Sequence, residues 1–136
     1  MYTKALMISS ALAMMALGLT ATFVPDDLLR YCGSNPQPLS ILIVQAAGAL
    51  YLGFAIMNWM AKENLIGGIY SRPVALGNFL HFFVMAAALV KALNIGQRTA
   101  PVWIVAFFYA IFATWFGLVL FGNPLRNKVA EGIPRR

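Results

Sequence analysis

Residues 73–94 read PVALGNFLHFFVMAAALVKALN, an apolar segment that contains the only histidine of the chain. At 1.5 Å per residue, a helix of this length reaches across a hydrocarbon core about 30 Å thick. Asn78 and His81 are three positions apart and therefore share a face of such a helix. The segment predicts a membrane-spanning helix with two polar groups inside it.

Three further apolar runs have a similar length, at residues 5–24, 39–60 and 101–121. Charged residues make up 10% of the 136 residues, whereas a soluble domain carries about a quarter. We therefore expect one domain over residues 1–136, an all-α integral membrane four-helix bundle whose first partner is the lipid bilayer. The +6 net charge does not indicate nucleic acid, because the basic residues lie at the expected helix ends.

The first run follows a short basic start, and this layout also fits a secretory signal peptide with a cleavage site at residues 19–21. We favour a membrane span because the run is long enough to cross the bilayer. Pro25 is expected to end this helix. Asp26 and Asp27 are then expected to cap a short helical turn.

The orientation follows from the distribution of lysine and arginine. The N-terminus, the second loop and the tail hold seven of them: Lys4, Lys62, Arg72, Arg126, Lys128, Arg135 and Arg136. The first and third loops hold three: Arg30, Lys91 and Arg98. The positive-inside rule then puts both termini in the cytoplasm of a bacterial cell, with the chain in the inner membrane and residues 122–136 as a basic tail.

Polar residues inside the expected spans are the candidates for ligand binding. They are His81, Asn78, Asn58, Tyr51 and Gln45. His81 lies about 12 Å into its helix, close to the bilayer midplane, where an ionisable residue is a candidate functional site. A neutral imidazole that holds neighbouring helices together is the alternative, and we favour it. We expect Asn58 and Asn78 to form an amide pair, and Gln45 to find a partner on the first or fourth helix.

The fourth expected helix has two dissimilar sides. Small residues form a ridge on one side: Ala106, Ala110, Ala113, Thr114 and Gly117. Aromatic residues lie on the opposite side: Phe108, Phe112 and Trp115. Because small residues let helix backbones approach closely in lipid, we expect the ridge to pack inward and the aromatic side to face lipid or a partner protein.

Several chemistries are excluded by what the spans lack. Every acidic residue lies outside them, which argues against a proton-coupled transporter and against a di-metal centre. A single histidine cannot ligate haem twice within one chain. The single cysteine, Cys32, can form neither an internal disulfide nor a Cys-x-x-Cys pair. We therefore expect neither a catalytic residue nor a metal site.

Two segments resemble small bacterial four-helix membrane proteins of the DoxX-like kind. They are residues 23–29, FVPDDLL, and residues 45–53, QAAGALYLG. The resemblance covers the helix count, the first loop and the second helix. In such proteins an arginine often stands where this chain has Gln45, so no role of that charge is carried over. The resemblance implies the fold, and some of these proteins accompany quinone-linked oxidoreductases.

Three functions are compatible with this pattern. The first is a small non-catalytic inner-membrane protein, acting as a subunit or as a binder of a hydrophobic ligand. The second is the membrane subunit of a quinone-linked oxidoreductase, with His81 donating a hydrogen bond to a quinone carbonyl. The third is an oligomeric small-molecule transporter. A homo-oligomer or a partner membrane protein is compatible with each of them.

Overall fold

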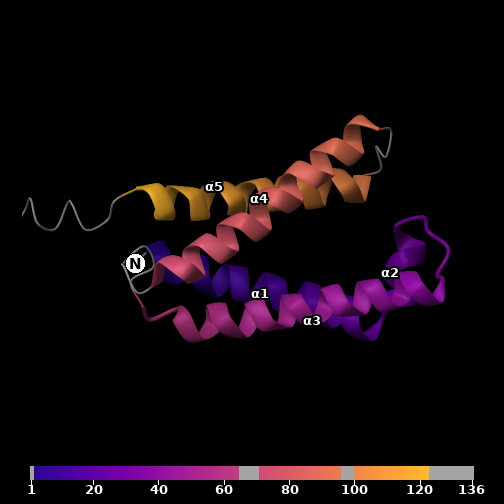
Figure 1. The fold of residues 1–136 in the computed structure, drawn as a ribbon, viewed down its shortest axis with the longest axis horizontal. Coiled ribbons are helices and arrows are strands. Elements are labelled where there is room, and N and C mark those ends of the chain that lie inside the picture. Colours follow the sequence, from indigo (N-terminus) through magenta and orange to yellow (C-terminus); the bar gives the residue numbers. More distant parts are fainter. Residues whose placement is uncertain (1, 65–70, 96–99, 123–136) are drawn as a thin grey trace, which may run out of the picture. The chain divides into compact units, whose positions relative to one another are not determined.

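A computed structural model describes residues 2–64, 71–95 and 100–122, and within these ranges the chain is helical without strands. The helices are α1 (Tyr2–Phe23), α2 (Pro25–Tyr31), α3 (Pro38–Ala61), α4 (Arg72–Asn94) and α5 (Ala100–Phe121), as Figure 1 shows. All except α2 are long and apolar enough to cross a membrane. The prediction of an all-α chain is therefore confirmed, and four helices have the length and composition of the predicted spans, which indicates a multi-pass membrane protein.

The ends of the helices follow from local sequence. Pro25 and Pro38 each begin a helix, where the missing N–H costs no hydrogen bond. At the start of α3, the backbone N–H of Gln37 donates to the Ser40 hydroxyl at 2.9 Å. This bond satisfies a backbone donor that has no partner within the helix. The predicted capping by Asp26 and Asp27 is wrong. Because the helix begins at Pro25, both acids lie within its first turn, where their negative charges interact favourably with the helix dipole.

The chain divides into two compact units. One holds residues 7–62, and thus most of α1 together with α2 and α3. The other holds the start of α1 with α4 and α5. The predicted single bundle of all four spans stays a prediction, and the basic tail lies outside the described residues.

In the first unit, α1 and α3 lie side by side (Figure 1) and approach closely at two glycines. A Cβ atom added to Gly48 would lie 2.8 Å from the Thr22 backbone nitrogen and 3.0 Å from the Gly18 carbonyl oxygen. A Cβ atom added to Gly18 would lie 2.9 Å from the Leu52 side chain. The missing side chains therefore let the two backbones touch, which is how helices associate in lipid.

In the second unit, α4 packs along α5 through a cluster of aromatic rings centred on Phe82, which is 1% exposed. Its ring stacks on Phe112 with 4.8 Å between ring centroids and on Phe116 with 5.6 Å. Tyr109 completes the cluster at 5.5 Å. Residues 109, 112 and 116 share one helix face, so this aromatic face of α5 is the packed one.

The predicted assignment of the two sides of α5 is therefore wrong in part. Phe112 was expected to face lipid but is buried, because its ring gains a stacked contact with Phe82 that lipid cannot offer. The small-residue ridge is also divided. Ala106 and Ala113 are buried as expected, whereas Ala110 and Thr114 are exposed.

Candidate functional site

The five predicted site residues lie in two units. Gln45, Tyr51 and Asn58 belong to α3, and Asn78 and His81 belong to α4. Gln45 and Asn58 are 13 residues apart on one helix, about 20 Å at the rise of an α-helix. They therefore cannot contact the same small ligand. The predicted amide pair of Asn58 and Asn78 joins residues of different units and stays a prediction.

Gln45 is engaged with α1, which confirms the expectation of a partner on the first or fourth helix. Its side-chain amide donates to the Thr22 carbonyl oxygen at 3.3 Å. This carbonyl lies in the last turn of α1, where the usual acceptor role within the helix is lost because the chain turns into α2 at Pro25. Gln45 thus satisfies a helix end, and Tyr51 is half-buried further along α3.

Asn58 is fully buried and bonded to α1. Its amide nitrogen donates to the Ser10 hydroxyl at 3.1 Å and approaches the Met14 sulfur at 3.7 Å. Ser10 and Met14 are buried as well. A polar contact of this kind between apolar helices fixes their register, so packing accounts for Asn58 without a ligand.

This contact makes a quantitative prediction. Asn58→Ala, Ser10→Ala and the double variant form a thermodynamic cycle, and the coupling energy from unfolding in mixed micelles should be about 0.6 kcal/mol, the average for hydrogen bonds between membrane helices. The cycle cancels the other contacts that each residue makes. Purely additive effects of the two substitutions would contradict the assigned bond.

On α4, Asn78 is fully buried and donates to the Val74 carbonyl oxygen of its own helix at 2.9 Å. His81 is half-buried and adjoins the aromatic cluster. Its ring centroid lies 5.3 Å from that of Phe82, edge to face, and 5.8 Å from that of Tyr109. The imidazole is thus held among rings at the α4–α5 contact.

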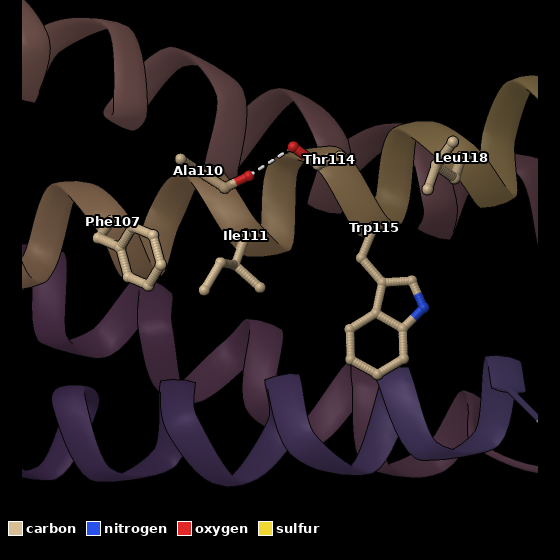
Figure 2. A pocket seen from close by; sticks show the side chains of 6 residues that line it. All are labelled: Phe107, Ala110, Ile111, Thr114, Trp115 and Leu118. Atoms are coloured by element: carbon tan, nitrogen blue, oxygen red, sulfur yellow. Dashed lines mark hydrogen bonds between the residues drawn. The ribbon is translucent and has the colours of Figure 1, made fainter.

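The open hollows of α5 are apolar. One of them, of about 460 Å³, is lined by two rows of side chains along α5 (Figure 2): Phe107, Ile111 and Trp115 in one row, and Ala110, Thr114 and Leu118 in the other. The Thr114 hydroxyl donates to the Ala110 carbonyl oxygen at 2.8 Å. Since this hydroxyl is already bonded, the surface offers a ligand mainly apolar contacts, with the indole N–H of Trp115 as a further polar group.

Two further hollows lie between α4 and α5 and meet at Phe121. The first, of about 480 Å³, is lined by Arg72, Pro73, Leu76, Leu120 and Phe121. The second, of about 390 Å³, is lined by Phe79, Phe83, Ala113, Thr114, Gly117, Leu118, Phe121 and Gly122. We call these two hollows together the α4–α5 groove. We did not predict this groove, because the embedded polar residues were taken as the site candidates. Its signal in the sequence is a stripe of apolar residues at helical spacing with one charged residue at its end.

Within the described ranges, the structure gives little support for a metal site, a thiol site or a strong ion pair. There, no three residues among His, Cys, Asp and Glu gather as metal ligands would. Cys32 is exposed and takes part in no disulfide within this part of the chain. Lys4 and Glu63 form an ion pair at 2.8 Å with both side chains more than half exposed, a contact that contributes little stability.

No family model, no curated protein and no solved structure matches this chain. The site is therefore interpreted from its own geometry.

Proposed function

We propose that the chain is a small non-catalytic membrane protein that binds a hydrophobic ligand in the α4–α5 groove, alone or as a subunit of a larger assembly. One observation carries the proposal: Gln45 and Asn58 of α3 bond to α1, whereas the hollows beside α5 are lined, apart from Arg72 and Thr114, by apolar groups. Concave, mostly apolar sites with few polar groups are typical of ligand pockets.

The cellular setting is part of the same proposal. The excess of lysine and arginine at the N-terminus, second loop and tail supports a bacterial inner-membrane protein with both termini in the cytoplasm. In that orientation the Arg72 end of the groove opens at the cytoplasmic surface. A relation to proteins of the DoxX-like kind remains a proposal that rests on residues 23–29 and 45–53.

Native mass spectrometry of the protein extracted in mild detergent tests this function. We expect a population that carries an additional mass of several hundred daltons, and organic extraction of the same sample should yield one enriched hydrophobic species. A lone monomer without any bound lipid, quinone or partner would contradict the proposal.

One contact favours a second candidate, the membrane subunit of a quinone-linked oxidoreductase. His81 and Tyr109 bring an imidazole and a phenol together beside Phe82, a combination that suits a quinone ring and its carbonyl oxygen. The extraction discriminates between the candidates. Quinone that is enriched with the wild type and lost from His81→Ala would favour the second, and a phospholipid that His81→Ala retains would favour the first.

A further inference from the structure

The α4–α5 groove follows one face of α4. Arg72, Leu76, Phe79 and Phe83 follow each other at spacings of four, three and four residues, so they form a single stripe. The stripe borders both hollows, which share Phe121 on the α5 side. The ring of Phe121 meets that of Phe79 edge to face at 5.6 Å between centroids.

The dimensions of the groove match one leaflet of a bilayer. Arg72 and Phe83 are 11 residues apart, which places them about 16 Å apart along the helix axis. Half of a hydrocarbon core about 30 Å thick is about 15 Å. A groove that begins at the end of a span and ends near the midplane therefore has the length of a lipid acyl chain.

The charge of the groove is confined to one end. Arg72 is exposed at the first residue of α4, and the remainder of the lining is apolar apart from the bonded Thr114 hydroxyl. Within the described part of the chain, Arg72 makes neither an ion pair nor a side-chain hydrogen bond. A guanidinium group at the level of lipid headgroups binds a phosphate through paired N–H donors.

From this arrangement we infer that the ligand of the groove is an anionic phospholipid, with its phosphate at Arg72 and one acyl chain along Leu76, Phe79 and Phe83. The inference rests on the proposed function and names its ligand class. A neutral quinone makes no use of Arg72. A zwitterionic lipid carries a cationic headgroup, which the guanidinium repels.

Lipid titration followed by native mass spectrometry tests the headgroup preference. The probes are phosphatidylglycerol and phosphatidylcholine with identical acyl chains, added to the detergent-purified protein. One arginine near the membrane surface contributes about 1 kcal/mol toward anionic lipid, so the occupancy ratio should favour phosphatidylglycerol about fivefold. Arg72→Gln should reduce this ratio to about one, and Arg72→Lys should retain most of it.

Lys91→Gln is the matched control, because Lys91 is exposed at the opposite end of the same helix and loses the same charge. It should keep the fivefold ratio. Equal occupancy by both lipids in the wild type, or an equal loss of preference in Lys91→Gln, would overturn the anionic assignment and leave the proposed hydrophobic site standing. Binding of neither lipid by a wild type that also carries no other bound mass would overturn the proposed function itself.

Discussion

Replacement of Gly48 by alanine is expected to reduce the free energy of unfolding by about 3 kcal/mol, at the upper end of the usual cost of overpacking. The added Cβ atom would meet the Thr22 backbone nitrogen at 2.8 Å and the Gly18 carbonyl oxygen at 3.0 Å. Backbone atoms cannot rotate away as a flexible side chain can. α1 and α3 must therefore separate, which also weakens the contacts of Gln45 and Asn58. Unfolding in mixed micelles with increasing SDS measures the effect.

Gly53→Ala is the control for this experiment. Gly53 lies on the same helix, and a Cβ atom added there meets nothing within 4 Å. We expect no loss of stability, because alanine is the better helix former. Equal stabilities of the two alanine variants would show that α1 and α3 do not approach at Gly48.

Truncation of Phe82 to alanine is expected to have the second largest effect, a loss of about 2–3 kcal/mol. Comparable truncations in soluble cores cost about 3–5 kcal/mol, part of which is transfer from water. Lipid is as apolar as the protein interior, so only the packing and cavity contributions remain. These are large here because Phe82 stacks on both Phe112 and Phe116.

Phe107→Ala provides the comparison, since it removes the same ring from a position that is 70% exposed. Lipid chains can fill the space of the lost ring, and the same SDS titration should detect a change below about 0.5 kcal/mol, as for other substitutions at the surface. If Phe82→Ala is as stable as Phe107→Ala, the aromatic cluster does not hold α4 to α5.

The spans could be predicted from the sequence because a bilayer demands length and apolar composition, and both are properties of the chain itself. The predicted boundaries differ from those of α1, α3, α4 and α5 by at most three residues. Pro25 marked the end of the first span and Pro73 the start of the third, through the backbone chemistry of proline. These are local rules, and no tertiary information is needed to apply them.

The packed faces could not be predicted in the same way. α5 carries aromatic and small residues around most of its circumference, so periodicity alone does not decide which side packs. The choice depends on Phe82, which offers stacking partners to residues 109, 112 and 116. That information lies on a different helix.

For the candidate site, the sequence led us to expect a partner of Gln45 on the first or fourth helix, which the structure confirms, but it did not indicate the partner of Asn58. Gln45 bonds a carbonyl oxygen that is released at the end of α1, and Asn58 bonds the Ser10 hydroxyl of α1. Both partners depend on which helices are neighbours. The groove was not predicted, because its lining is mostly apolar and forms no recognisable sequence motif.

The most direct test of a hydrophobic site in the α4–α5 groove is to fill the groove. Leu76 lines it and is 45% exposed, whereas Leu80, 48% exposed on the same helix, lines neither hollow. Native mass spectra of the wild type, Leu76→Trp and Leu80→Trp, each extracted in mild detergent, should show the bound mass in the wild type and in Leu80→Trp but not in Leu76→Trp. A bound mass retained equally by both tryptophan variants would contradict the account.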